Sequence, residues 1–353
     1  MSKKQSAIVI CPGRGTYNQT ELGYLAKYYS GKVKAEKFLG EIDKARRGLG
    51  QTAISELDSA ERFSAREHAT SENASPLIYA CALSDYRSID LDRYEIVAIT
   101  GNSMGWYLAL ACAGVLRGTS GFELVNTMGR LMQTQGCGAQ VIYPLVNAQW
   151  QLDPQLVQVC EQTVAEVNAD KNCHVYSSIR LGGMQVLAGN DAGITALLEK
   201  LPKQQERYPF QLYQHSAFHS PLLEHIPELA QAELDISLFN QAELPLIDGN
   251  GKIWQPGATN MQALYDYTLN RQIIQTYDFS SAVEVAIKEF APDKLIVLGP
   301  GTTLGPPVAQ SLIRHRWLGL TSKSEFTLMQ KNDPFVLSMG IDAQRSAVVQ
   351  TQT

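Results

Sequence analysis

Several features are missing from this sequence, and each absence argues against a class of protein. The chain of 353 residues has 6 cysteines, but no Cys-x-x-Cys pair, so neither a disulfide framework nor a zinc knuckle is expected. Its 30 Lys and Arg are outnumbered by 35 Asp and Glu, which is not the basic balance of a nucleic-acid binder. No apolar run approaches the roughly 18 residues of a transmembrane helix, so we expect no membrane span.

The composition that remains is that of a folded protein. Apolar residues make up 44% of the chain and charged residues 18%, which excludes a disordered chain or a collagen-like repeat. The basic N-terminus leads into only five apolar residues, at positions 7–11, and this predicts a strand, not a signal peptide. We therefore expect a cytoplasmic, reduced protein with one large domain or two moderate ones.

The order of predicted elements indicates an α/β protein with an insert. Short apolar runs at 7–11, 95–100 and 294–298 each end at a glycine-containing turn and predict buried strands. Residues 135–208 have a different rhythm, and together with the extended segment that follows they predict strand-helix-strand-strand-helix-strand, the order of a ferredoxin-like subdomain. We expect a core formed by residues 1–134 and 209–320, and a loosely packed C-terminal tail at 321–353.

A candidate nucleophile lies between a predicted strand and a predicted helix. Residues 101–105 read Gly-Asn-Ser-Met-Gly and match the G-x-S-x-G pattern, in which small residues allow a serine to stand on a sharp turn. Such a turn exposes the hydroxyl of Ser103, and the N-terminus of the following helix presents amides to a developing oxyanion. On the pattern alone, an ordinary serine in a glycine-flanked turn is an equally good interpretation.

A serine nucleophile needs a base, and three of the six histidines cluster between residues 214 and 225. A metal site formed by His215 and His219 is a minor alternative. The extended run before them and Pro221 after them argue against one helix that would place both on the same face. We therefore predict that the cluster supplies a base and holds no metal.

Two motifs together resemble a known family. The serine motif and residues 217–221, Ala-Phe-His-Ser-Pro, are similar to the nucleophile and histidine motifs of acyl-CoA:acyl carrier protein transacylases, which include the malonyl transacylase and the acyltransferase domains of fatty-acid and polyketide synthases. Pro-Gly-Arg-Gly at 12–15, Gly-Arg-Leu-Met-Gln at 129–133 and Leu-Gly-Pro-Gly at 298–301 agree in order and spacing. The resemblance spans about residues 7–315. It implies an α/β-hydrolase-like core with an inserted ferredoxin-like subdomain.

The same resemblance implies a mechanism. Ser103 is the expected nucleophile and His219 the expected base, oriented by the backbone carbonyl of Gln272, while the amides of Arg14 and Met104 form the oxyanion hole. The substrate is a CoA or phosphopantetheine thioester, and no bound cofactor is implied. Acyl-CoA and an acyl carrier protein are the expected partners.

The chain departs from the family at a position that bears on the acyl group. Members that use malonyl groups carry an arginine where this sequence has Met128. A guanidinium binds a carboxylate through a bidentate, charge-assisted pair, and methionine offers only an apolar wall. We therefore expect a non-carboxylated acyl group, with a local shift that lets Arg130 serve as the alternative. Phe218 matches the form of the histidine motif that disfavours branched acyl groups, which indicates a short, unbranched chain.

Three further departures lie near the expected site. Asn102 replaces a histidine, Trp106 a glutamate and Arg14 a glutamine. We assign Asn102 and Trp106 to the acyl pocket with Met128 and Phe218, although packing in the core is the better interpretation of a lone tryptophan. The Arg14 side chain either folds away or contacts the phosphate arm of the substrate.

Two other functions remain open from the sequence. The acyl-serine could be released to water, as in a proofreading hydrolase that strips acyl groups from carrier proteins. A catalytically silent module that only binds carrier proteins is the less favoured alternative, because the serine and histidine motifs are intact. Because carrier proteins are usually acidic, we expect docking on basic residues, with these candidates: Arg14, Arg130, Lys203, Arg207 and Arg314.

Overall fold

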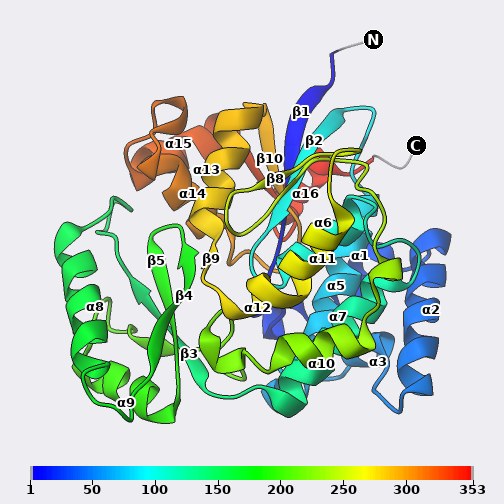
Figure 1. Ribbon diagram of the computed structural model, residues 1–353. Coiled ribbons are helices and arrows are strands. Elements are labelled where there is room, and N and C mark those ends of the chain that lie inside the picture. The colour runs from blue at the N-terminus through cyan, green and yellow to red at the C-terminus, as the bar shows by residue number, and fades with distance from the viewer. Residues whose placement is uncertain (1–2, 351–353) are drawn as a thin grey trace.

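A six-stranded sheet forms the centre of the molecule, of which the computed structural model describes residues 3–350 (Figure 1). The strand order is β11-β10-β1-β2-β7-β8, and every pair is parallel except β7–β8. Its strands are β1 (Gln5–Cys11), β2 (Tyr94–Gly101), β7 (Leu246–Ile247), β8 (Ile253–Trp254), β10 (Lys294–Val297) and β11 (Val336–Ser338). Residues 7–11 of β1 are fully buried, because a parallel sheet is covered on both faces. The three buried strands predicted from apolar runs are therefore confirmed.

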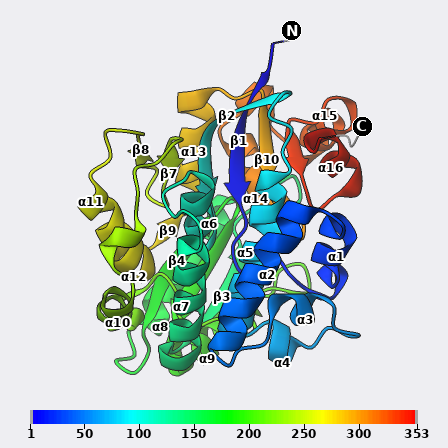
Figure 2. The same ribbon diagram turned by 90° about the vertical axis from the view of Figure 1, so that its right-hand side faces the viewer.

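Helices pack on this sheet and on one another. Helix α6 (Gly105–Cys112) contacts β1 and β2, and it lies beside α5 (Ser71–Arg87) and α7 (Ser120–Gln135), as Figure 2 shows. Helices α13 (Phe279–Phe290) and α14 (Gly305–Arg314) contact each other, and α13 packs on β2 and β7. The remaining α-helices of the core before β10 are α1 (Tyr24–Tyr29), α2 (Val33–Gly48), α3 (Ile54–Asp58), α4 (Ala65–His68), α10 (Ile226–Glu233), α11 (Met261–Asp266) and α12 (Gln272–Ile274).

A second sheet carries the predicted insert, drawn in green beside the core in Figure 1. Its elements are β3 (Ala139–Pro144), α8 (Pro154–Val167), β4 (Val175–Leu181), β5 (Met184–Gly189), α9 (Asp191–Lys200) and β6 (Phe210–Gln211). The sheet order is β6-β3-β5-β4, and β9 (Tyr277–Asp278) from the core adds a fifth, parallel strand beside β4. The ferredoxin-like element order is confirmed, although β6 begins after the expected boundary at residue 208.

The prediction of a loosely packed tail after residue 320 is wrong for the described residues 321–350. This segment forms α15 (Lys323–Asn332), strand β11 and α16 (Asp342–Val348), and β11 pairs in parallel with β10. Arg345 of α16 is 5% exposed and forms an ion pair of 2.8 Å with the fully buried Asp85 of α5. The polar composition was misleading because one short strand and one buried arginine attach an otherwise polar segment to the core.

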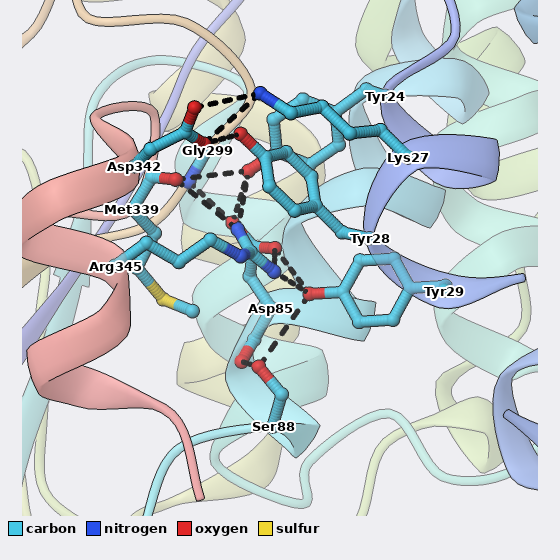
Figure 3. A network of polar contacts seen from close by, with 10 residues as sticks. All are labelled: Tyr24, Lys27, Tyr28, Tyr29, Asp85, Ser88, Gly299, Met339, Asp342 and Arg345. Carbon is cyan, nitrogen blue, oxygen red and sulfur yellow. Dashed lines mark hydrogen bonds and ion pairs between the residues drawn. The ribbon is translucent and has the colours of Figure 1, made fainter. Parts of the chain in front are cut away.

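The contacts around this ion pair form a polar network (Figure 3). The Arg345 guanidinium donates to the hydroxyl of Tyr24 at 2.9 Å and to the carbonyl of Met339 at 3.1 Å. The Tyr24 hydroxyl in turn donates to Asp85 at 2.7 Å, and Tyr29 also hydrogen-bonds Asp85. The network ties α1, α5 and α16 together.

None of the helices within residues 3–350 combines the length and the apolar character that a membrane crossing requires.

Candidate active site

Ser103 stands on the turn between β2 and α6, where the backbone is strained. Its φ of 56° lies in the left-handed region, which a residue with a side chain rarely adopts. The flanking positions must be glycine because a side chain would not fit there. A Cβ on Gly101 would lie 2.2 Å from the carbonyl oxygen of Gly105, and a Cβ on Gly105 would lie 2.4 Å from that of Cys11. The G-x-S-x-G spacing therefore reflects the close approach of this turn to itself and to β1.

His219 faces Ser103 from the loop after β6. Its Nε2 lies 2.7 Å from the Ser103 Oγ, and its Nδ1 lies 2.5 Å from the backbone oxygen of Gln272. Since a carbonyl only accepts hydrogen bonds, Nδ1 carries the proton and Nε2 is free to accept one from the serine. The structure thus brings together the three residues that the motifs predicted, in the order of a triad whose third member is a main-chain oxygen.

Burial lowers the pKa of His219 and so keeps this base neutral. His219 is 4% exposed, and burial lowers its pKa to about 4, with the hydrogen bond to Gln272 acting in the opposite direction. At neutral pH the imidazole is therefore unprotonated. A neutral imidazole hydrogen-bonded to a serine hydroxyl is suited to general-base catalysis.

Gln272 contributes more than its backbone carbonyl. It begins α12, directly after the π-helical turn η4 (Tyr267–Arg271). Its side-chain amide donates to the backbone oxygen of Ser103 at 3.0 Å and accepts from the hydroxyl of Tyr107 at 3.0 Å. One residue thereby fixes both the base and the turn that carries the nucleophile, a role of the side chain that the sequence did not indicate.

Of the two amides predicted for the oxyanion hole, one lies in this turn and the other in the loop after β1. Met104 is the N-cap residue of α6, and Arg14 follows β1 in the Pro-Gly-Arg-Gly loop. Neither amide donates a hydrogen bond to another group within residues 3–350. A Cβ on Gly13 would lie 2.5 Å from the carbonyl oxygen of Asn102, so the loop and the serine turn are in close contact.

A cavity opens in front of Ser103 and His219, with about 450 Å³ of unfilled space when its mouth is included. Most of its wall is apolar and is formed by the turn before α6, by α7, by the histidine loop and by α12. The apolar lining residues are Met104, Val125, Met128, Met132, Phe218 and Ile273. Met128 and Phe218 therefore lie where the sequence placed them.

Arg130 does not reach this cavity. Its guanidinium pairs with Glu233 of α10, and both side chains are partly exposed. It is absent from the cavity wall within residues 3–350 because positions 128 and 130 point to different sides of α7. The alternative that Arg130 replaces the missing arginine by a local shift finds no support in this geometry.

Arg14 is one of the lining residues, and its side chain contacts two others, Ser71 and Phe218. It donates to the Ser71 hydroxyl at 2.7 Å and to the carbonyls of Ala69 and Gln214, both at 2.9 Å. Its guanidinium carbon lies 5.4 Å from the centre of the Phe218 ring. Arg14 is only partly exposed, and these contacts hold its guanidinium against α5 and the loop before His219, which is an unfavourable position for docking an acidic partner.

The assignment of Asn102 and Trp106 to the acyl pocket is corrected by the structure. Trp106 is fully buried, donates from its indole nitrogen to Thr268 at 3.0 Å and packs edge-on against Tyr267. The backbone amide of Asn102 donates to Cys11 at 3.1 Å and fastens the turn to β1. Neither residue forms part of the cavity wall described within residues 3–350.

The structure adds residues to the site that the sequence did not suggest. Ser71 and Ser75 of α5 line the cavity, and so does Tyr107 of α6. For the two serines the available signal was spacing, since they lie four residues apart on one helix face.

His215 and His219 have different hydrogen-bond partners in the structure. No group of three His, Cys, Asp or Glu side chains suited to a metal ion occurs within residues 3–350. The Nδ1 of His215 lies 2.9 Å from the side-chain amide oxygen of Gln140, in strand β3 of the insert. The His215 ring is therefore positioned by the insert and forms no pair with His219.

The chain has the mixed α/β fold of acyl carrier protein S-malonyltransferases. One such enzyme, from Burkholderia pseudomallei 1710b, is 19% identical with a TM-score of 0.72 over 97% of this chain and 98% of that one. The malonyl-CoA:ACP transacylase of Synechocystis sp. PCC 6803 is 17% identical with a TM-score of 0.70 over 98% of this chain and 100% of that one. The fold implied by the motifs is therefore confirmed.

Two further comparisons extend this likeness. A malonyl-transacylase solved in complex with its type II polyketide synthase acyl-carrier protein is 18% identical with a TM-score of 0.72, over 98% of this chain and 99% of that one. The type I polyketide synthase Pks15/1 of Mycobacterium marinum, for phenolphthiocerol synthesis, is 25% identical over 253 residues. That match covers 69% of this chain but only 11% of the synthase. No family model matches the chain.

Proposed function

We propose that this chain is an acyltransferase that moves a short acyl group from a CoA thioester to an acyl carrier protein through an acyl-serine intermediate. The observation that carries the proposal is the contact of 2.7 Å between the Ser103 Oγ and the unprotonated Nε2 of His219, at the wall of a cavity. The fold shared with S-malonyltransferases supports the same reaction class.

The reaction proceeds in two displacements. His219 takes the proton of the Ser103 hydroxyl as the oxygen attacks the thioester carbonyl, and the amides of Arg14 and Met104 stabilise the tetrahedral oxyanion. The carbon–sulfur bond breaks, and His219 returns the proton to the leaving CoA thiol. The phosphopantetheine thiol of the carrier protein then attacks the serine ester by the same steps in reverse, which restores the free hydroxyl.

An acyl carrier protein is the proposed acceptor. A structural neighbour has been solved in complex with its acyl-carrier protein, and the curated relative is a polyketide synthase. Of the basic residues expected to dock this partner, Arg14 lines the cavity and Arg130 is paired with Glu233. The docking surface must therefore rely on other residues.

The nature of the acyl group is a finer question. The sequence-based prediction of a non-carboxylated group considered position 128 alone. The presence of Met128 on the cavity wall favours that prediction, and the inward position of Arg14 opposes it. The proposed function is therefore restricted to a short acyl group, and its charge is considered separately below.

The experiment uses the intact masses of the enzyme and of a holo acyl carrier protein after incubation with acetyl-CoA and malonyl-CoA in parallel. We expect an acyl adduct on the enzyme that moves to the carrier, and complete loss of the enzyme adduct in Ser103→Ala. An adduct that persists in Ser103→Ala would sink the nucleophile assignment.

The same experiment separates the alternatives. Acyl groups lost from a pre-acylated carrier as free acid, in a manner dependent on Ser103, would establish the hydrolase. No adduct and no loss, with the carrier still bound, would establish the silent binding module.

A further inference from the structure

The guanidinium of Arg14 is surrounded only by neutral partners. The groups that accept its hydrogen bonds are one hydroxyl, of Ser71, and two backbone carbonyls, of Ala69 and Gln214. Burial lowers the pKa of Arg14 to about 10, and no carboxylate within residues 3–350 offsets this effect. The side chain remains protonated at neutral pH, so its positive charge is uncompensated by the protein itself.

Arg14 also retains donors that the protein does not use. A guanidinium has five N–H groups, and Arg14 has three hydrogen bonds to the chain. Its Nε is shielded from solvent and has no hydrogen-bond partner within residues 3–350. Because Nε has almost no accessible surface, it does not face the cavity, and the N–H left for a ligand is the second one on Nη1, whose other N–H is bonded to Ser71.

The cation lies at the wall where Met128 also lies. Arg14 is fastened to Ser71 at the start of α5, and a Cβ on Gly129 of α7 would lie 2.6 Å from the carbonyl oxygen of Ser71. Helices α5 and α7 are thus in direct contact at this point. Arg14, Ser71, Met128 and Gly129 all line the cavity that holds Ser103.

We infer, on the basis of the proposed function, that Arg14 is the anion-binding residue of the acyl cavity and that the acyl group taken there carries a free carboxylate. The guanidinium comes from the loop after β1, at the position where the transacylase motif has glutamine. Position 128, which supplies the arginine in malonyl-using members, contributes an apolar wall here.

A carboxylate on the acyl group fits the place of this charge better than a phosphate does. Arg14 shares its cavity with the nucleophile, so its partner belongs to the part of the substrate near the reacting carbonyl. The phosphate of CoA or phosphopantetheine lies at the far end of a long arm from the thioester. A carboxylate one or a few carbons from the carbonyl can reach the cavity wall while the carbonyl carbon lies at Ser103.

The experiment compares single-turnover acylation of Ser103 by malonyl-CoA and by acetyl-CoA. In Arg14→Gln, which keeps the backbone amide, we expect the ratio of the malonyl rate to the acetyl rate to fall by about 100-fold or more, because the carboxylate loses its charged partner. In Arg14→Gln/Met128→Arg, the guanidinium returns to the same wall from α7. We expect this variant to regain at least about tenfold in that ratio.

Arg130→Gln is the matched control, because Arg130 lies outside the cavity and is paired with Glu233. Its malonyl-to-acetyl ratio should equal that of the unmodified chain. A fall in this variant, or an unchanged ratio in Arg14→Gln while both acyl adducts form, would overturn the inference.

A binding measurement keeps the inference testable if Arg14→Gln does not fold. Titration calorimetry of Ser103→Ala with malonyl-CoA and acetyl-CoA compares two ligands that share every phosphate and differ in the carboxylate. We expect malonyl-CoA to bind at least about tenfold more tightly, and equal affinities would contradict the inference. Failure of the proposed function has a different result, since neither CoA ester would then acylate the unmodified chain.

Discussion

Two arginines in different regions of the molecule have opposite surroundings. Arg345, in the network of Figure 3, is 5% exposed and is paired at 2.8 Å with Asp85. Although burial acts to lower its pKa, the Asp85 carboxylate and the hydroxyl groups of Tyr29 and Tyr24 raise it above the ordinary value. Arg14, at the cavity, has no carboxylate and its pKa is lowered to about 10 by burial. The positive charge of Arg345 is thus balanced by a carboxylate of the chain, and the positive charge of Arg14 is not.

A fully buried arginine elsewhere in the core shows which of these differences is specific to Arg14. Arg46 is fully buried, and burial lowers its pKa to about 10, with Glu72 and Asp43 acting in the opposite direction. All three of its nitrogens donate to groups of the chain. A lowered pKa is therefore shared by Arg14 and Arg46. What distinguishes Arg14 is that no carboxylate opposes the effect of burial and that Arg14 is among the residues lining the nucleophile's cavity, which is why we assign it a ligand.

The largest expected effect lies at the cavity. His219→Ala removes the base at 2.7 Å from the Ser103 Oγ, and we expect the acylation rate to fall by about 10³-fold or more. Rapid-quench measurement of the acyl-enzyme checks this, with circular dichroism as the control for folding. A loss of less than about tenfold would mean that another group activates the serine.

The next effect belongs to the network and should appear in stability. Arg345→Met leaves the buried Asp85 carboxylate without its partner, and we expect a loss of about 3–5 kcal/mol in the free energy of unfolding. Urea denaturation measures it, and the acylation rate of the folded fraction should not change.

Lys27→Met is the control for this comparison, because it breaks an exposed ion pair with Asp342 in the same region. We expect a loss below about 1 kcal/mol. If the two variants lost the same stability, the network around Asp85 would not be the anchor of the C-terminal segment.

The smallest expected effect is the change of the acylation rate with pH. Because the pKa of His219 is lowered to about 4 from 6.5, the base stays neutral as the pH falls through 6.5. The acylation rate should therefore remain near its plateau at pH 6 and decline only as the pH approaches about 4. Single-turnover rates across this range check it, and a half-maximal rate near pH 6.5 would contradict the burial of the base.

Stability should follow the same proton with a defined sign. Between pH 6.5 and about 4 the unfolded state binds a proton at this histidine that the folded state does not. His219 therefore lowers the stability of the folded state as the pH falls through this range, and it has no such effect above it.

The sequence predicted those parts of the site that depend on local geometry. Glycine is needed at 101 and 105 because the backbone approaches other backbone there. Ser103, His219 and Gln272 were predicted from motifs that resemble those of the transacylases, and the three meet as predicted. The sequence could not show where long side chains point. Arg14 turns inward to α5, and Trp106 turns into the core, because of contacts with residues distant in the chain.

The fold, like the site, could be predicted from the sequence only in part. Apolar runs marked the central strands, and the alternation of helices and strands marked the insert. The C-terminal segment was missed because its attachment depends on β11, a strand of 3 residues, and on Arg345, whose partner Asp85 lies 260 residues away in the sequence. Neither feature produces an apolar run or a motif.

The most direct test is a competition between equimolar malonyl-CoA and acetyl-CoA for the unmodified chain, read as the intact mass of the acyl-enzyme at early times. If Arg14 binds the carboxylate of the substrate, the malonyl adduct on Ser103 should exceed the acetyl adduct by about tenfold or more. An acetyl adduct equal to or larger than the malonyl adduct would contradict the account and restore the non-carboxylated acyl group predicted from Met128.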